Sequence, residues 1–183
     1  MKKWFFLIIV LLSSCSPKVV SYVNSNANFS QFETYRLVST KADSKNITPE
    51  NTLVFDLIRK SISKEMSKRS YEVSNISPDL TLRYEVTSST RVESNTNQVG
   101  PYYNPQVTTR TIYESILLIE LYDPNKKLVW QSSYDLSQQR KEKKASKAIE
   151  KGVGHIFTSY PYRANSAEVD ETLKTIDNKK VRQ

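Results

Sequence analysis

The sequence predicts an α+β domain, a two-layer sandwich in which two helices cover one face of a four-stranded, mostly antiparallel or mixed sheet. Three observations predict this class. Four stretches alternate apolar and polar residues, two longer stretches place apolar residues at helical spacing, and the stretches follow one another in the order β-α-β-β-β-α. Helices with one apolar face and half-buried strands bury both surfaces most simply when the helices pack on one side of the sheet.

The first strand and the first helix are predicted between residues 31 and 69. A helix begins at Pro49, because Thr48 is a favoured N-cap and proline is favoured at the first helical position. Residues 31–39 alternate as a strand, and one face carries Phe32, Thr34, Arg36 and Val38. The apolar stripe of the helix, which ends near Arg69, contains Leu53, Val54, Leu57, Ile58, Ile62 and Met66.

Three strands and a second helix are predicted in the rest of the domain. Residues 80–92 alternate as a long strand, and a polar segment with glycine and prolines separates them from a β-branched strand at residues 108–122. A proline-containing turn then returns residues 128–136 as the hairpin partner. The second helix is predicted at residues 141–160, where Gly152 indicates a close approach of the helix to the sheet.

The N-terminus is typical of a secreted, lipidated protein. Lys2 and Lys3 precede nine apolar residues, too few to span a bilayer, which takes about 20, but enough for a signal peptide. The following Leu12-Ser13-Ser14-Cys15 resembles the lipobox of bacterial lipoproteins, in which the cysteine is acylated and the chain is cut before it. The predicted organisation is a signal peptide at residues 1–14, a lipidated Cys15 with a flexible tether up to residue 28, one domain at residues 29–163 and a polar tail at residues 164–183.

The predicted anchor also indicates a location. Ser16 rather than an aspartate follows Cys15, and no acidic cluster comes after it. By resemblance to Gram-negative lipoproteins, this favours the outer membrane, with the domain facing the periplasm.

Short motifs spread over residues 28–162 resemble those of the lipoprotein family known as domain of unknown function 4136. Members of that family usually carry glycine at the end of the first helix, where this chain has Ser70. The resemblance implies a small α/β lipoprotein domain, and it implies no catalytic residues. The motifs are residues 29–35, Pro78-Asp79-Leu80, residues 119–123, Leu128-Val129-Trp130 and residues 156–161.

The composition restricts the chemistry. One cysteine excludes an intramolecular disulfide and a cysteine-based zinc site, one histidine excludes sites that need two imidazoles, and three glycines leave no glycine-rich phosphate loop. His155 is expected at the rim of the second helix, without a nucleophile. No pair of carboxylates has a spacing that singles it out. We therefore expect no catalytic residues, no metal and no cofactor.

Two segments are candidates for binding. The sequence Gly100-Pro101-Tyr102-Tyr103 lies in the polar loop, where Tyr102 and Tyr103 are expected either to contact a partner or to fold back on the sheet as a lid. A basic cluster is expected either to contact anionic lipid headgroups or to be a solvated helix face. A predicted envelope location argues against nucleic acid as its partner. The cluster contains Arg140, Lys141, Lys143, Lys144 and Lys147.

Three functions remain open from the sequence. The first is a non-enzymatic envelope lipoprotein, an accessory or binding module held in the membrane through Cys15 and contacting an envelope protein. The second is a small hydrolase that uses acidic residues. The third is a carrier of an apolar ligand between sheet and helices. The position and lining of a pocket would distinguish them.

Overall fold

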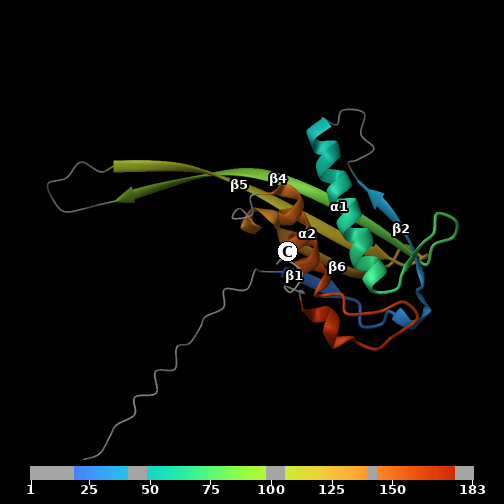
Figure 1. Cartoon of the computed structure of the whole chain (residues 1–183). Coiled ribbons are helices and arrows are strands. Elements are labelled where there is room, and N and C mark those ends of the chain that lie inside the picture. Colours follow the sequence, from blue (N-terminus) through green and yellow to red (C-terminus); the bar gives the residue numbers. More distant parts are fainter. Residues whose placement is uncertain (1–18, 41–48, 98–105, 140–143, 176–183) are drawn as a thin grey trace, which may run out of the picture.

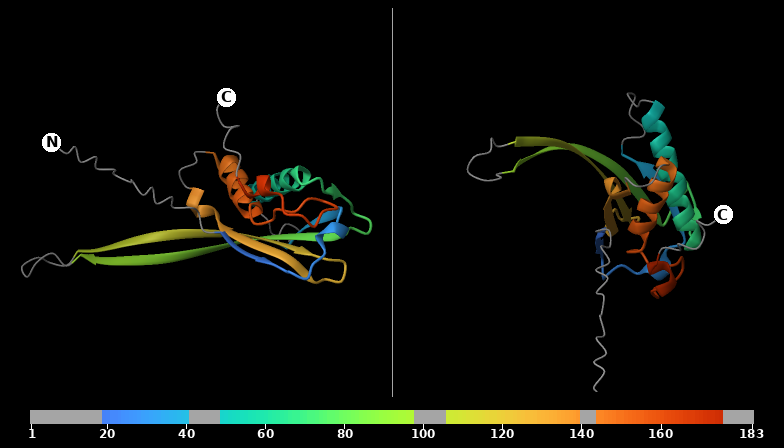
Figure 2. Two further views of the ribbon diagram at one scale, coloured as in Figure 1. Left: turned by 90° about the horizontal axis from the view of Figure 1, so that it is seen from below. Right: turned by 60° about the vertical axis from the view of Figure 1, so that its left-hand side comes forward.

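The fold is a two-layer α+β sandwich in a computed structural model that describes residues 19–40, 49–97, 106–139 and 144–175. Both helices, α1 (Pro49–Lys68) and α2 (Ala145–Phe157), lie on the same face of the sheet (Figure 1, Figure 2). The predicted class is confirmed, but the sheet has six strands rather than four, in the order β1-β6-β5-β4-β2-β3. They are β1 (Val19–Val23), β2 (Thr34–Ser39), β3 (Glu72–Val73), β4 (Leu80–Asn97), β5 (Gln106–Tyr122) and β6 (Leu128–Asp135).

One of the two additional strands comes from the predicted tether. Val19–Val23 pairs antiparallel with β6, and Val19 lies opposite Tyr134. The flexible tether predicted up to residue 28 is therefore wrong for this segment. Three valines and a tyrosine have high strand propensity, but five mostly exposed residues give no alternation that marks a core strand. Pairing with β6 supplies the stabilisation that the local sequence lacks.

The sheet is mixed because α1 connects two parallel strands. β2 and β4 pair in parallel, with Tyr35 opposite Leu80, and parallel neighbours need a crossover connection such as this helix. The carboxylate of Asp79 links the two strands where β4 begins. Its Oδ2 accepts from the backbone N–H groups of Glu33 and Thr34 at 3.0 and 2.8 Å and from the Thr34 hydroxyl at 2.8 Å. Partial burial raises the pKa of Asp79, but these hydrogen bonds outweigh it and lower the pKa below its usual value.

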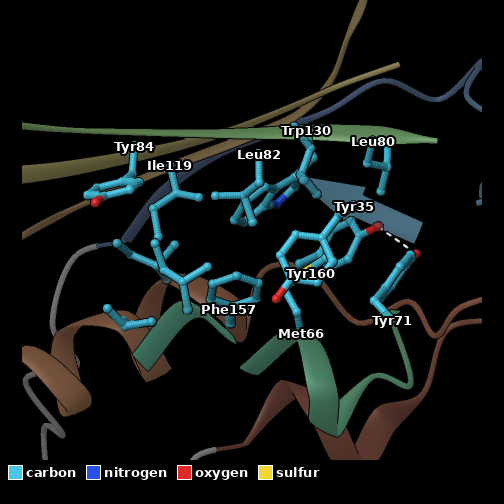
Figure 3. Close-up of a cluster of buried hydrophobic side chains, with 14 of the residues drawn as sticks. Tyr35, Met66, Tyr71, Leu80, Leu82, Tyr84, Ile119, Trp130, Phe157 and Tyr160 are labelled. Atoms are coloured by element: carbon cyan, nitrogen blue, oxygen red, sulfur yellow. Dashed lines mark hydrogen bonds between the residues drawn. The ribbon is translucent and has the colours of Figure 1, made fainter. Parts of the chain in front are cut away.

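The hydrophobic core fills the space between sheet and helices (Figure 3). The inward residue of β2 is Tyr35, whereas Arg36 is exposed. The strand begins at Thr34 because Phe29–Gln31 forms a 3₁₀ turn, so the predicted start at residue 31 is wrong. Fully buried side chains from both layers include Leu80, Leu82, Ile119, Trp130, Phe157 and Tyr160.

Helix α1 matches the prediction closely. Ile58, Ile62 and Met66 are fully buried, whereas Leu53 is 62% exposed and lies outside the core. Thr48, the predicted N-cap, lies outside the described residues. After the helix, Ser70 has a φ of 64°. This left-handed conformation is the one that glycine adopts at no steric cost, which explains the glycine expected at this position from the family resemblance.

Arg69, at the end of α1, forms hydrogen bonds with the chain at the end of α2. It is 1% exposed, and its guanidinium donates from Nε to the carbonyl of Tyr160 at 2.8 Å and from Nη2 to the carbonyl of Phe157 at 2.7 Å. Its Nη1 pairs with Oε2 of Glu65 at 2.8 Å. Arg69 therefore supplies side-chain donors to the carbonyl of the last residue of α2 and to a carbonyl three residues beyond it.

The C-terminal segment is part of the fold up to Thr175. The backbone N–H of Ala164 donates to the carbonyl of Arg69 at 2.9 Å, and that of Asn165 donates to the carbonyl of Phe32 at 3.0 Å. An ion pair between Arg163 and Asp170 closes this segment on itself. The predicted domain boundary at residue 163 therefore falls too early.

The two glycines of α2, which begins at Ala145 and not at residue 141, provide a matched test of helix packing. A Cβ at Gly152 would overlap Cδ2 of Leu136 and lie 3.4 Å from the Tyr134 ring, whereas a Cβ at Gly154 meets nothing within 4 Å. The predicted close approach at Gly152 is confirmed. Alanine is favoured over glycine in helices by about 1 kcal/mol. We expect Gly154→Ala to raise the free energy of unfolding by about this amount and Gly152→Ala to give no gain, because Leu136 must shift. Urea denaturation of both variants checks this; equal gains would contradict the packing at Gly152.

Candidate membrane-facing end of the domain

A long two-stranded ribbon extends beyond the rest of the sheet. β4 and β5 pair without interruption from Thr81–Tyr122 to Asn97–Gln106, whereas β6 ends where Asp135 meets Ile116. About ten residues of each strand lie past that point, which is about 33 Å at roughly 3.3 Å per residue. Figure 1 shows this ribbon standing free of the other strands.

The predicted polar loop at residues 93–106 is therefore wrong for its described residues, 93–97 and 106, which are strand. Its residues have no apolar alternation because a free ribbon has no face on the core; Val92, for instance, is 64% exposed. A strand is recognised in a sequence by alternating apolar and polar residues. This alternation stops where the strand leaves the core, although the strand itself continues. The predicted contact residues Tyr102 and Tyr103 lie outside the described residues, between the two strands.

The described chain enters the fold at the same end of the sheet. β1 starts at Val19, opposite Tyr134 near the end of β6, and the ribbon departs from this end. Cys15 lies outside the described residues. Only four residue steps separate it from Val19, which an extended chain covers in about 14 Å. Val20 and Tyr22, 58% and 52% exposed, are the next large apolar side chains after this point.

The basic cluster lies only partly within the described residues. Arg140, Lys141 and Lys143 are outside them, while Lys144 and Lys147 are exposed at the start of α2. The α2 helix follows β6 and the 3₁₀ turn Leu136–Gln139, so its start is near the end of the sheet from which the ribbon departs. Further along the helix, Glu150 pairs with Lys64 of α1, which ties the two helices together.

His155 packs at the edge of the two layers. Its ring stacks on Tyr134 with the centroids 5.1 Å apart and an interplanar angle of 13°. Partial burial lowers the pKa of His155 below 6.5, and the positive charge of Lys151 adds to this. His155 thus lies at the rim of the helix, as expected, and the contact described for its ring is packing against Tyr134.

The lowered pKa of His155 predicts a pH dependence of stability. The unfolded chain binds more protons than the folded chain between the lower folded value and 6.5, so the histidine's contribution is complete above pH 6.5 and is lost as the pH falls. We expect His155→Phe, which keeps the stacking on Tyr134, to flatten the decrease in unfolding free energy between about pH 7 and pH 5. Urea denaturation across this range measures the difference; identical slopes for both proteins would contradict the assignment.

The described residues contain no group of three or more histidine, cysteine, aspartate or glutamate side chains that could hold a metal ion. Within the same ranges, no helix is both long and apolar enough to cross a membrane. Glu120 lies on β5, and Asp123 caps the turn after it by accepting from the backbone N–H of Lys127.

Most of the motifs that carry the family resemblance contribute side chains to the core. Phe29 stacks on Tyr162 with the centroids 4.0 Å apart, and Trp130 packs on Phe157 and Tyr160. The indole Nε1 of Trp130 donates to the carbonyl of Ser159 at 3.1 Å. These motifs therefore maintain the sandwich. Sequence reasoning missed the role of Arg69, because its partners lie about 90 residues away along the chain.

Comparison with solved structures supports this fold. A PDZ domain protein from Parabacteroides distasonis is similar with a TM-score of 0.54 and 14% identity, over 80% of this chain and 36% of that protein. The chain thus spans about a third of that protein, and the similarity concerns the fold alone. Weaker similarities are to a PelC dodecamer from Paraburkholderia phytofirmans (TM-score 0.43, 10% identity, 80% and 98% covered) and a minor lipoprotein from Acinetobacter baumannii (0.36, 10%, 68% and 89%).

No curated protein matches the chain in sequence. The model of the family described as "Domain of unknown function (DUF4136)" matches residues 19–162, four fifths of the chain. The resemblance predicted from the motifs is thereby confirmed, and the chain belongs to this family.

Proposed function

We propose that this protein is an envelope lipoprotein, anchored through Cys15 in the outer membrane with its domain in the periplasm, and that it is a non-enzymatic module binding a protein partner through the tip of the β4–β5 ribbon. The observation that carries the proposal is that the ribbon departs from the end of the sheet where the chain enters from Cys15. A fold that exposes an arm of about 33 Å on its anchored side is suited to contacts near the membrane.

The short link limits where the partner is. Because β1 begins at Val19, only four residue steps follow Cys15, and the start of the sheet stays within about 14 Å of the lipid headgroups. The exposed Lys144 and Lys147 at the start of α2 would face anionic lipid there, each contributing about 1 kcal/mol. The partner therefore lies in or next to the membrane, within reach of the ribbon.

A shortened ribbon tests the proposal. Thr90 to Tyr113 are replaced by Asn-Gly, which forms the tight hairpin turn that joins paired positions such as Ser89 and Glu114. In the described part of the chain, the core and the residues packed on it extend to Val86 on β4 and begin at Leu117 on β5, so the variant should fold with an unchanged melting temperature. We expect it to lose the partner captured by crosslinking in intact cells. Retention of the same crosslinked partner would refute the role of the ribbon.

Two point-variant controls separate the anchor from the contact. Cys15→Ala should leave the protein without lipid, as intact mass would show, and remove it from the membrane fraction. A Tyr102→Ala, Tyr103→Ala double variant should keep its lipid and its melting temperature and lose the crosslink. A large loss of stability in the double variant would show instead that the tyrosines are packed as a lid.

A further inference from the structure

A groove opens on the helix-free face of the sheet, at the end opposite to the ribbon. It has a volume of about 600 Å³. It lies where β2 and β4 begin and where the turn joins β5 to β6, so segments more than 80 residues apart meet there. Its lining residues are Arg36, Asn75, Ser77, Pro78, Thr81, Arg83, Tyr122, Asp123, Pro124 and Lys126.

Three cations and one carboxylate line this groove, which gives a net charge of +2. Arg36 donates from Nε to the Thr81 hydroxyl at 3.1 Å, which fixes the side chain, and no acceptor among the described residues meets its two terminal nitrogens. Arg83 lies over the ring of Tyr122, with Cζ 5.5 Å from the centroid. Within the described ranges, none of the three cations forms an ion pair with a carboxylate. An arginine guanidinium that a neighbouring side chain holds in place can donate two parallel hydrogen bonds to a carboxylate or a phosphate.

Asp123 indicates that the ligand carries a hydrogen-bond donor beside its anionic group. Its Oδ1 accepts from the backbone N–H of Lys127 at 2.8 Å, and no protein donor in the described part of the chain meets its Oδ2. A carboxylate in the same groove repels a phosphate and a ligand carboxylate alike and attracts an ammonium group, so it favours a ligand that carries an amine or amide beside its anion. Asn75 and Ser77 add uncharged hydrogen-bonding groups, and Tyr122 with the two prolines adds apolar surface.

We propose that this groove binds a peptide segment through its carboxylate, held by Arg36 and Arg83, with Asp123 facing an amine or amide of the same ligand. Peptides present all of these groups within one short segment: carboxylate, amine, amide and apolar carbon. The volume of the groove is in the range of small-ligand sites, about 300–1,000 Å³. This site is separate from the ribbon tip and does not depend on the function proposed for it.

The test uses the full chain in nonionic detergent and follows the arginine Nε–Hε resonances by NMR. The probe is the tripeptide Ala-Glu-Ala with free termini, and the neutral comparison is acetylated and amidated Ala-Gln-Ala. We expect saturable shifts for Arg36 and Arg83 with the acidic peptide only. An Arg36→Gln, Arg83→Gln variant should bind about tenfold more weakly or worse, a loss that corresponds to about 1.4 kcal/mol.

The control removes the same charge elsewhere. Arg59→Gln with Lys60→Gln changes two exposed residues of α1, which lies on the other face of the sheet, and should leave the affinity unchanged. Lys126→Gln, in an exposed turn, tests the groove again if the double arginine variant fails to fold. Non-saturating shifts with the acidic peptide, an equal loss in the control, or saturable binding of inorganic phosphate or phosphatidylglycerol vesicles without peptide binding would each overturn the proposal.

Discussion

Replacing Trp130 by aspartate is expected to abolish folding. Trp130 is fully buried at the centre of the sandwich, where it contacts Phe157 and Tyr160. Losing such a side chain costs about 3–5 kcal/mol, and burying an unpaired carboxylate adds several more. A domain of this kind is stable by only about 5–15 kcal/mol, so the sum removes most or all of its stability. Far-UV circular dichroism and the loss of a cooperative urea transition measure the effect.

The matched control is Ser133→Asp on the same strand. Ser133 is half-buried on the opposite, helix-free face, because successive side chains of β6 alternate between the two faces. The same carboxylate can be solvated there, and we expect a change within about 1 kcal/mol. If Trp130→Asp folds with native-like cooperativity, or if Ser133→Asp unfolds to the same extent, the assignment of faces on β6 is wrong.

Arg69→Met is expected to lower the free energy of unfolding by about 3–5 kcal/mol, the cost of breaking a buried charged pair. The substitution leaves the Glu65 carboxylate, whose side chain is 12% exposed, without its buried partner. It also removes the guanidinium donors from the carbonyls of Phe157 and Tyr160, of which Phe157 still accepts from the backbone N–H of Tyr160 at 3.0 Å. Arg69→Lys should recover only part of the loss, because a compact ammonium cannot reach all of these acceptors from one position. Denaturant titration of the two variants gives both values.

Lys68 is the control for charge at this helix end. It pairs with the same Glu65, but its side chain is 49% exposed. Lys68→Met should therefore cost less than about 1 kcal/mol, as exposed ion pairs do. Similar losses for Lys68→Met and Arg69→Met would show that charge near Glu65, rather than the buried network of Arg69, provides the stability.

The family motifs have structural explanations once the fold is known. Asp79 holds β2 against β4, Trp130 fills the core, and Tyr160 joins Tyr71 through a buried hydroxyl pair at 2.8 Å. Burial raises the pKa of Tyr71 to about 12, so this pair stays protonated throughout the physiological range. Most motif residues serve the sandwich, whereas Pro78, Tyr122 and Asp123 line the groove. We expect function to depend on three surfaces outside the core: the anchored end, the ribbon and the groove.

The sequence alone determined the features that depend on residues close together along the chain. Apolar residues at helical spacing located α1, with Ile58, Ile62 and Met66 buried as predicted, and Gly152 was correctly assigned to a close contact. The alternation of β4 near Leu80 and Leu82 and the turn at Asp123 were local signals too. Such patterns can be recognised because buried residues recur about every 3.6 residues in a helix and every second residue in a strand.

Only the tertiary structure decided the rest. β1 forms because the edge of β6 is open to pairing, and the ribbon beyond Thr87 is strand although its described β4 side chains, such as Ser88, Ser89 and Val92, are exposed. The inward face of β2 depends on where the preceding 3₁₀ turn places Thr34. The partners of Arg69 and the lining of the groove come from segments far apart along the chain. The periodicity of a sequence segment shows which of its own residues are buried. Strand pairing, register and the side chains that converge on a groove depend instead on which elements come into contact. Those contacts form only when the whole chain folds around its hydrophobic core.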